Sequence, residues 1–215
     1  MFNRTKILWW LRVIEYGFNY FVLELPRGLD FSRRQRDTKT LNESSGYALT
    51  SKKALEAFIK VSGAEERRNF IDIGGGKGGT AYFANLLDFK KSTSLEYEQD
   101  LHKIACKNIS KLKLEDKVNL INLDAFQYHI YYEYSHIFMF RPLNGELMHK
   151  LLLHVVNNIN ENKSKVQQPI VFLLYGGIEI EHIKDLLDKC DNLEIVHDDM
   201  CPFRNTNRRV LKWTL

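Results

Sequence analysis

The sequence predicts an α/β protein built on a doubly wound, seven-stranded and mostly parallel sheet. From residue 69 onward, apolar runs of strand length alternate with longer stretches of helical periodicity, which is typical of parallel strands with helices on both faces. Near the C-terminus this alternation stops, and two strand-like runs follow each other directly. Their link of about eleven residues is too short and too irregular for a parallel crossover, so we expect an antiparallel last strand.

Length and composition fit one domain with a short extension. The chain has 215 residues, of which 44% are hydrophobic and 27% charged, with only 12 Gly and 4 Pro. These values exclude a collagen-like chain, a disulfide scaffold and a wholly disordered protein. The formal net charge of +4 permits an anionic partner without requiring one.

The cysteines favour a reducing compartment. Cys106, Cys190 and Cys201 are widely spaced and odd in number, with no C-x-x-C pair, so we interpret them as reduced thiols and expect a cytoplasmic protein. The apolar segment near the N-terminus does not change this expectation. Charged residues interrupt it and no small-residue cleavage site follows, so it fits neither a signal peptide nor a spanning helix.

Residues 1–46 are expected to form an extension made of an amphipathic helix and a linker. An apolar stripe recurs there at three- and four-residue steps: Ile7, Leu11, Ile14, Phe18, Phe21 and Leu25. Such a helix packs on the main domain or on a second subunit, or it makes peripheral membrane contact through residues 1–25. Pro26 and Gly28 end it. The polar, charged stretch 29–46 is typical of a mobile linker or of a lid that closes over a ligand.

The main domain is expected over residues 47–215. Its first helix begins after Thr50 or Ser51 and ends near Gly63. The strand-like runs and helical stretches then follow in turn: strands at 69–73, 92–95, 118–123, 136–140, 170–175, 193–197 and 209–213, and helices at 79–87, 98–112, 147–159 and 179–189.

The strongest chemical signal is the segment FIDIGGGKGG at residues 70–79, between a predicted strand and a predicted helix. Glycines there permit a tight turn and close approach of the backbone to a ligand at the helix N-terminus. The motif G-x-G-x-x-G is satisfied by Gly74, Gly76 and Gly79. Glu96 follows roughly 20 residues later, where its carboxylate can accept hydrogen bonds from ribose hydroxyls. This pattern predicts a nucleotide or nucleoside site without separating dinucleotides from adenosyl cofactors.

Asp72 favours the adenosyl cofactors. It places a carboxylate at the mouth of the site, which repels a pyrophosphate and attracts an ammonium or sulfonium charge. With Asp72 followed by Gly74, Gly76 and Gly78, the sequence resembles the class I S-adenosylmethionine-dependent methyltransferases, whose first motif is an acidic residue followed by G-x-G-x-G. The antiparallel last strand is also typical of that family. The resemblance covers roughly residues 47–215 and implies a Rossmann-like fold that uses S-adenosyl-L-methionine.

The resemblance also implies which residues hold the cofactor. The glycine loop would contact its amino acid part, Glu96 its ribose hydroxyls and Asp124 its adenine amine, with Phe126 flanking the base. The complete expected set is Asp72, Gly74, Gly75, Gly76, Gly78, Glu96, Asp124, Ala125 and Phe126.

For the methyl acceptor, the resemblance points to the segment after the fourth predicted strand, where Arg141 and Asn144 are the candidate substrate-binding residues. Enzymes that modify exocyclic base amines often carry Asn or Asp followed by Pro-Pro and an aromatic residue there, whereas this chain has Arg-Pro-Leu-Asn. We therefore expect a small-molecule or glycan- or lipid-linked acceptor and no clear nucleic-acid partner. Several arginines are candidates for a basic rim: Arg33, Arg34, Arg36, Arg204, Arg208 and Arg209.

The candidate residues also have ordinary explanations. Asp72 can cap a helix or pair with Lys77, Glu96 can be a solvated strand end, and Asp124 can initiate a turn. Three carboxylates at three successive strand ends favour the cofactor site. Arg141 binds an anionic substrate or pairs with a nearby carboxylate, and the two interpretations weigh equally. Spacing predicts no metal site and identifies no catalytic base.

Two other functions stay open. An NAD(P)-dependent Rossmann oxidoreductase explains the glycines and Glu96 but explains neither Asp72 nor the antiparallel end of the sheet. A non-catalytic adapter would keep a methyltransferase-like core and attach to a partner or membrane through the first helix.

Overall fold

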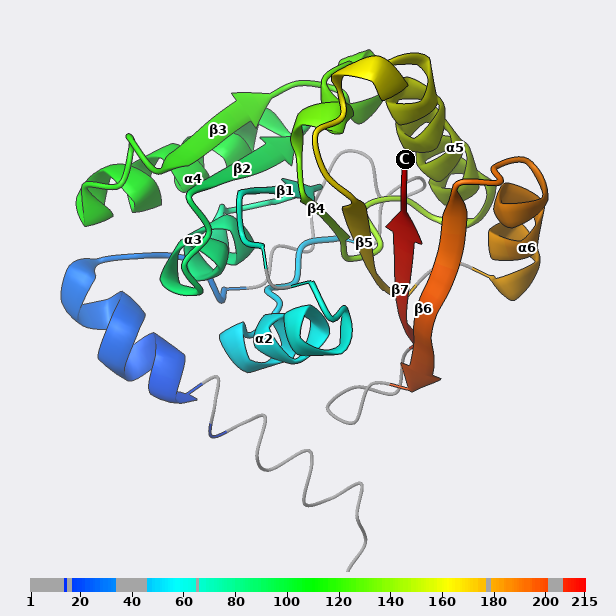
Figure 1. The fold of residues 1–215 in the computed structure, drawn as a ribbon. Coiled ribbons are helices and arrows are strands. Elements are labelled where there is room, and N and C mark those ends of the chain that lie inside the picture. The colour runs from blue at the N-terminus through cyan, green and yellow to red at the C-terminus, as the bar shows by residue number, and fades with distance from the viewer. Residues whose placement is uncertain (1–13, 15–16, 34–45, 65, 177–178, 201–206) are drawn as a thin grey trace, which may run out of the picture.

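The computed structural model describes residues 14, 17–33, 46–64, 66–176, 179–200 and 207–215. Seven strands form one sheet in the order β3-β2-β1-β4-β5-β7-β6, drawn in Figure 1. The first five strands run parallel and β7 is antiparallel to both of its neighbours. The strands are β1 (Asn69–Ile73), β2 (Lys91–Glu96), β3 (Val118–Asn122), β4 (His136–Met139), β5 (Ile170–Tyr175), β6 (Leu193–Met200) and β7 (Asn207–Trp213). The predicted fold class, including the antiparallel last strand, is confirmed.

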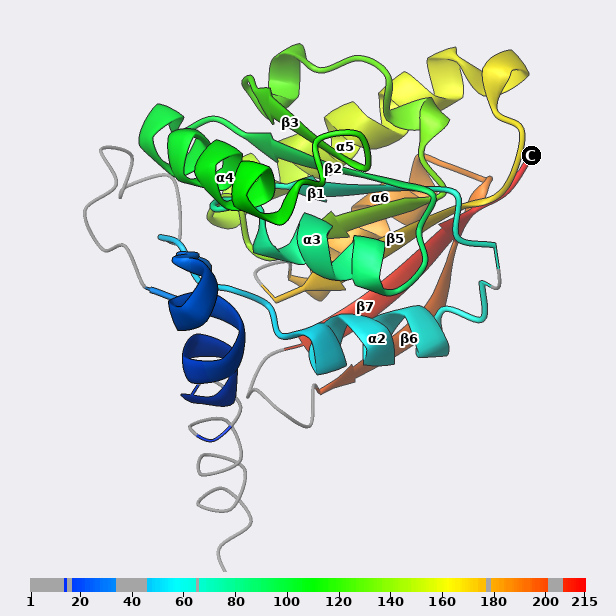
Figure 2. The ribbon, with the colours of Figure 1, turned by 90° about the vertical axis from the view of Figure 1, so that its left-hand side faces the viewer.

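Helices cover both faces of this sheet, as Figure 2 shows. On one face lie α2 (Lys52–Val61), α3 (Gly79–Leu86) and α4 (Gln99–Leu112), and on the other lie α5 (Gly145–Glu161) and α6 (Ile180–Asp188). Side chains of β1 alternate between the two layers. Phe70 joins the core under α2 and α3, whereas Ile71 and Ile73 join the core under α5. Asp72 shares the face of Phe70 and therefore points toward the layer that contains α3.

The sequence-based boundaries agree with the structure in most elements. Ser51 is the N-cap of α2, where its side chain accepts a hydrogen bond from the Ala54 amide at 3.3 Å. Between β3 and β4 the chain makes only two short 3-10 turns, η3 (Ala125–Gln127) and η4 (Tyr131–Glu133).

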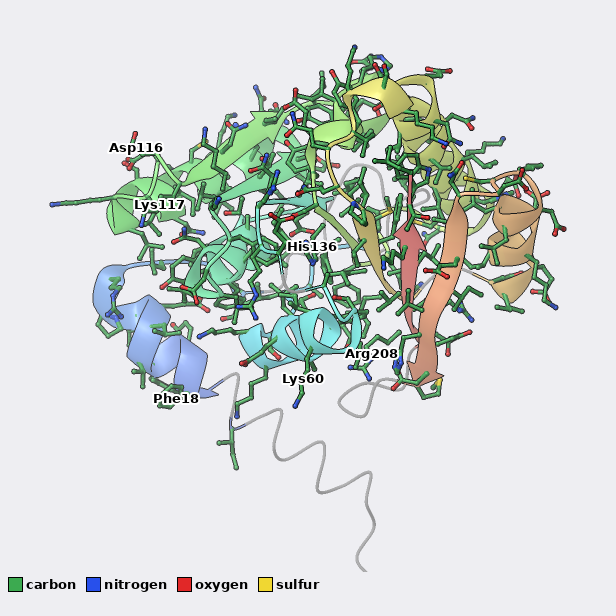
Figure 3. All side chains as sticks on the ribbon, viewed as in Figure 1. Phe18, Lys60, Asp116, Lys117, His136 and Arg208 are labelled. Atoms are coloured by element: carbon green, nitrogen blue, oxygen red, sulfur yellow. The ribbon has the colours of Figure 1, made fainter. Side chains whose placement is uncertain are left out.

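The last two strands are longer than predicted, and their charged side chains pair across the ladder. Arg208 binds the Asp199 carboxylate through two hydrogen bonds of 2.6 and 2.8 Å, and Arg209 donates to Asp198 at 3.1 Å. Both arginines are buried, so their assignment to a basic rim is wrong: they neutralise carboxylates of the neighbouring strand. Arg208 is labelled beside this ladder in Figure 3. A register shift between Ile195 and His197 interrupts the pairing.

The N-terminal extension turns back onto the domain at Glu24. Its described helical segments are η1 (Asn19–Glu24) and the 3-10 turn η2 (Leu25–Arg27). The buried Glu24 carboxylate accepts hydrogen bonds from the amides of Phe31 and Ser32, each at 3.0 Å. The Phe31 ring then stacks on Tyr82 of α3 at a centroid distance of 5.4 Å.

The described part of the apolar stripe is exposed. Phe18 is 60% exposed, Phe21 65% and Leu25 55%, and Ile14 is also exposed; Figure 3 labels Phe18 at the end of η1 away from the sheet. Packing of these four side chains on the main domain is therefore not observed. Among the described residues, no helix is long and apolar enough to cross a membrane.

Some expectations fall on residues outside those described. They concern Ile7 and Leu11 of the stripe, residues 34–45 of the predicted linker with Arg34 and Arg36 of the basic rim, Cys201, and Arg204 of the same rim. Of the other two cysteines, Cys106 is exposed and Cys190 is buried, and both are free thiols.

Candidate functional site

The glycine loop joins the end of β1 to α3 and curls over the end of β2. Gly74, Gly76 and Gly78 have φ angles of 76°, 55° and 80°, a region that side-chain-bearing residues rarely adopt. The amides of Gly74 and Gly75 donate to the Leu95 carbonyl at 2.9 and 3.1 Å. These bonds fasten the loop to the end of β2. The loop itself follows β1, which forms the topological switch point with β4, the place where doubly wound sheets bind ligands.

The loop is enclosed as well as bent. A Cβ on Gly76 would collide with the Tyr47 ring, and one on Gly74 would lie 2.6 Å from the Pro142 side chain. Beside Gly75, the Ser94 hydroxyl is buried with no hydrogen-bond partner among the described residues. A buried, unpaired hydroxyl beside the glycine loop is the chemistry expected where a polar ligand completes the site.

Asp72 lies buried at the end of β1. Burial raises the pKa of its carboxyl group to about 7, a hydrogen bond from Thr80 opposes that rise, and the negative charge of Glu96 adds to it. The carboxyl group therefore holds its proton to a higher pH than an ordinary aspartate does. A positive charge on a bound ligand would favour the ionised form.

Glu96 ties the glycine loop to the end of β2. Its Oε2 accepts a hydrogen bond from the Gly76 amide and its Oε1 accepts one from the Glu98 amide, both at 2.7 Å. Burial raises the pKa of Glu96, while these backbone hydrogen bonds lower it. A carboxylate offers about four lone-pair positions, so each oxygen keeps the capacity to accept a ligand hydroxyl.

The residues after β3 form a tight turn. Asp124 caps η3 by accepting a hydrogen bond from the Phe126 amide at 2.9 Å. Asp124 therefore does initiate a turn, as the structural alternative to cofactor binding predicted. The Ala125 carbonyl accepts from the Tyr131 hydroxyl at 2.8 Å. Because β3, β2 and β1 are neighbouring parallel strands, their carboxyl ends share one edge of the sheet. The structure thus brings Asp124, Glu96 and Asp72 to this edge.

The two candidate substrate residues lie between β4 and α5. Arg141 is exposed and has a φ of 43°, and Asn144 is the N-cap residue of α5. Between them, Pro142 packs against Gly74. This segment therefore borders the glycine loop directly, so a ligand held by the loop would lie near Arg141.

Sequence reasoning missed a network that fastens the N-terminal segment to the glycine loop. Lys77 is buried, and its ammonium group donates to Asp30 Oδ1 at 2.7 Å and to the Arg33 carbonyl at 2.9 Å. Asn108 joins the same network by donating to the carbonyls of Asp30 and Lys77 at 3.0 and 3.2 Å. The expected alternative, a pair between Lys77 and Asp72, is not observed. A lysine among glycines was the only signal for this network, and it did not indicate the partner.

The sheet order, the glycine loop and the acidic strand ends define a class I S-adenosylmethionine-dependent methyltransferase. Residues 42–201 match the family described as ribosomal RNA adenine dimethylase, and the chain belongs to this family. The enzyme class and the cofactor expected from the sequence are thereby confirmed, and neither an oxidoreductase nor a non-catalytic adapter is supported.

Solved structures show the same fold at low sequence identity. A human protein described as methyltransferase 10 domain containing protein is 13% identical, with a TM-score of 0.62 over 96% of this chain and 97% of that one. A putative tRNA methyltransferase from Streptococcus pneumoniae is 13% identical, with a TM-score of 0.57 over 77% of this chain and 70% of that one. TrmK of M. capricolum, bound to S-adenosyl-homocysteine, is 11% identical, with a TM-score of 0.53 over 73% and 66%. Comparison with curated protein sequences gave no match.

Replacement of Gly76 by alanine is expected to abolish cofactor binding, because the new Cβ displaces Tyr47 and the loop. Thermal unfolding with S-adenosylhomocysteine provides the measurement, since a ligand at about 100 times its dissociation constant stabilises by about 2.7 kcal/mol. Gly63→Ala is the matched control. Gly63 also has a positive φ, of 63°, but nothing lies within 4 Å of an added Cβ, so this variant should keep the ligand-induced shift. An unchanged shift in Gly76→Ala would contradict the site assignment.

The raised pKa of Asp72, about 7, predicts opposite pH trends for stability and for binding. Between the unfolded and folded pKa values the folded state binds more protons, so this group lowers the free energy of unfolding of the ligand-free protein as the pH rises. Affinity for the cationic cofactor should instead fall below pH 7, by up to about tenfold per pH unit. Calorimetric titration with S-adenosylhomocysteine, whose amino group is positive, measures this. Asp72→Asn should bind weakly with a flatter pH profile. Asp116→Asn, an exposed change in the turn between α4 and β3, should behave as wild type. A wild-type profile in Asp72→Asn would count against the role.

Proposed function

We propose that the protein transfers the methyl group of S-adenosylmethionine to an acceptor that carries an anionic group, either a small molecule or a glycan- or lipid-linked compound. The observation that carries this proposal is the segment after β4. It packs on the glycine loop through Pro142 and presents Arg141, an exposed guanidinium, where base-amine methyltransferases often carry Asn-Pro-Pro-aromatic. A guanidinium suits recognition of carboxylate or phosphate.

We further propose that the cofactor lies along the carboxyl ends of β1, β2 and β3. Asp72 would face a positive group of the cofactor, the glycine loop of residues 74–78 would contact its amino acid part, and Glu96 would accept hydrogen bonds from the ribose hydroxyls. Asp124, Ala125 and Phe126 would surround the adenine. The enclosed glycine loop and the unpaired Ser94 hydroxyl support this placement.

Bound S-adenosylmethionine supplies an electrophilic methyl group, and the residues of this chain would contribute alignment and water exclusion. Pro142 and Tyr47, which cover opposite parts of the glycine loop, would limit access of water. Arg141 would hold the acceptor but cannot accept its proton, because a guanidinium stays charged. No described residue is assigned as the general base.

The extension, residues 1–46, is proposed to form a unit distinct from the methyltransferase domain, residues 47–215, and to cover the cofactor loop in part. The bonds from Lys77 to Asp30 and to the Arg33 carbonyl support this covering role.

An RNA adenine is the second candidate acceptor, because the matching family is described as ribosomal RNA adenine dimethylase. The two candidates make different demands on Arg141. A small anionic acceptor needs it for a direct contact, whereas RNA would engage many cationic side chains at once.

The acceptor is identified by incubating the protein and labelled S-adenosylmethionine with separate fractions of a cell lysate. These fractions are total RNA, a nuclease-treated fraction, an organic extract and a protein fraction. We expect label in a nuclease-resistant fraction, with incorporation into it lowered at least about tenfold by Arg141→Ala, since a charged hydrogen bond contributes about 1.5–3 kcal/mol. Arg68→Ala, which removes an exposed arginine paired with Glu66, should leave incorporation unchanged. Binding of S-adenosylhomocysteine should be normal in both variants. Label confined to RNA would overturn the acceptor proposal and leave the methyltransferase assignment intact.

We also propose that residues 1–25 contact a membrane surface. The exposed apolar side chains of Phe18, Phe21 and Leu25, together with the basic residues earlier in the segment, suit the interface of an anionic bilayer.

Sedimentation of the full chain with vesicles containing phosphatidylserine tests this contact. Phe18→Ser/Phe21→Ser should lose most of the binding, whereas Tyr97→Ser, which alters an exposed aromatic residue at the end of β2, should bind as wild type. If the double variant instead changes only the oligomeric state in size-exclusion chromatography, the stripe is a subunit interface and the membrane proposal fails.

A further inference from the structure

Four potential metal-binding side chains meet between α5 and α6. These helices follow the neighbouring strands β4 and β5 and cover the same face of the sheet (Figure 2). Glu146 and His149 lie in the first turns of α5, and His182 and Asp185 lie in α6. Each pair has a spacing of three residues, which places its two side chains on one face of the helix.

Glu146 faces both imidazoles. Its Oε1 lies 3.9 Å from His149 Nδ1 and its Oε2 lies 3.7 Å from His182 Nε2. One ligand atom from each of the three residues lies within 4.8 Å of the others. In a tetrahedral zinc site with metal–ligand bonds of about 2.0–2.1 Å, the ligand atoms stand roughly 3.4 Å apart. Small side-chain rotations therefore convert this cluster into a coordination site.

Asp185 is placed to orient His149. Its Oδ2 lies 3.0 Å from His149 Nε2, although the ring is not yet aligned for a straight hydrogen bond. The same oxygen accepts from Lys189 at 2.7 Å. A turn of the ring that lets Nε2–H donate to Asp185 would leave the lone pair on Nδ1, the nitrogen nearer Glu146. Metal-binding histidines commonly have such a carboxylate behind them.

A purely structural role accounts less well for this arrangement. The rings of His149 and His182 stack at a centroid distance of 4.4 Å and an angle of 4°. Both rings thus present a nitrogen atom to the Glu146 carboxylate. His149 is buried, whereas the Glu146 side chain is 64% exposed, which leaves an ion a route from solvent.

We propose that Glu146, His149 and His182 bind one divalent transition-metal ion, with Zn²⁺ as the best match, and that Asp185 is the positioning residue for His149. Two histidines and one glutamate are a known zinc ligand set that leaves a fourth position open. The ion would lie at the start of α5, directly after the segment that contains Arg141 and Asn144. This inference does not rest on the proposed acceptor. It also differs from the expectation of no metal site, because the third ligand, His182, lies far from Glu146 and His149 in the sequence.

A second pair of side chains could also bind zinc, so a test of the proposed site needs a control for it. His102 Nε2 lies 3.4 Å from the exposed Cys106 sulfur on α4, and a thiolate with an imidazole also attracts Zn²⁺. This pair offers only two ligands, so its zinc binding should be weaker. A His102→Ala/Cys106→Ser variant removes it without touching α5 or α6.

Zinc titration of the chelator-treated full chain in competition with a chromophoric chelator tests the proposal. We expect one tight site in the wild type and in His102→Ala/Cys106→Ser. His182→Ala should weaken binding at least about a hundredfold and Asp185→Asn about 10–100-fold, the range for partners of metal ligands. Tight binding retained in His182→Ala and lost in His102→Ala/Cys106→Ser would overturn the proposal, as would an absence of tight binding in the wild type.

Two further measurements separate lost coordination from lost folding. Co²⁺ in the wild-type site should give the strong visible absorption of a tetrahedral complex, and Asp185→Asn should alter that spectrum, which a merely structural residue would not do. Zn²⁺ should raise the melting temperature of the wild type and leave that of His182→Ala unchanged, while the two ion-free proteins melt at similar temperatures. An ion-free His182→Ala protein that is already unfolded would be replaced by Glu146→Gln, an exposed change with the same expected loss.

Discussion

The hydrogen bond between the Gly76 amide and the Glu96 carboxylate joins the ends of the two strands on which the site is built. It spans 2.7 Å and is buried, so it is stronger than the same bond in water. Glu96 in turn keeps a raised pKa because it is buried, and its charge helps to raise the pKa of Asp72. This contact thus fastens the glycine loop to the end of β2 and holds Glu96 where its charge raises the pKa of Asp72.

The N-terminal segment is fastened to the same loop from the other side. Lys77 cannot remain buried without partners, because an unpaired ammonium in the interior is costly, and its partners are Asp30 and the Arg33 carbonyl. Residues 30–33 are therefore held in place by a side chain of the glycine loop itself. A rearrangement of the glycine loop would therefore also displace residues 30–33, and a displacement of residues 30–33 would disturb the loop.

Features set by local periodicity were predictable from the sequence. The alternation of Phe70, Ile71, Asp72 and Ile73 identifies a buried strand, and the short link before β7 identifies its antiparallel direction. Contacts between distant segments were not predictable in this way. The sequence shows Lys77 close to Asp72 but cannot show that folding brings Asp30 closer, and the same is true of Glu146 and His182. Arg208 and Arg209 did carry a signal that was missed: two adjacent aspartates in the preceding strand.

That aspartate–arginine ladder also affects how the sheet ends. β6 is an edge strand, and an exposed edge of unpaired backbone groups invites pairing with another chain. Here the edge carries Glu194, Asp198 and Asp199, and its register shifts between Ile195 and His197. Because Asp198 and Asp199 are neutralised by the arginines of β7, it is the charge of Glu194 and the local irregularity that oppose the addition of a further strand. The sheet is thereby protected against growth into aggregates at this side, even though the apolar side chains of Ile195 and Met200 are exposed on it.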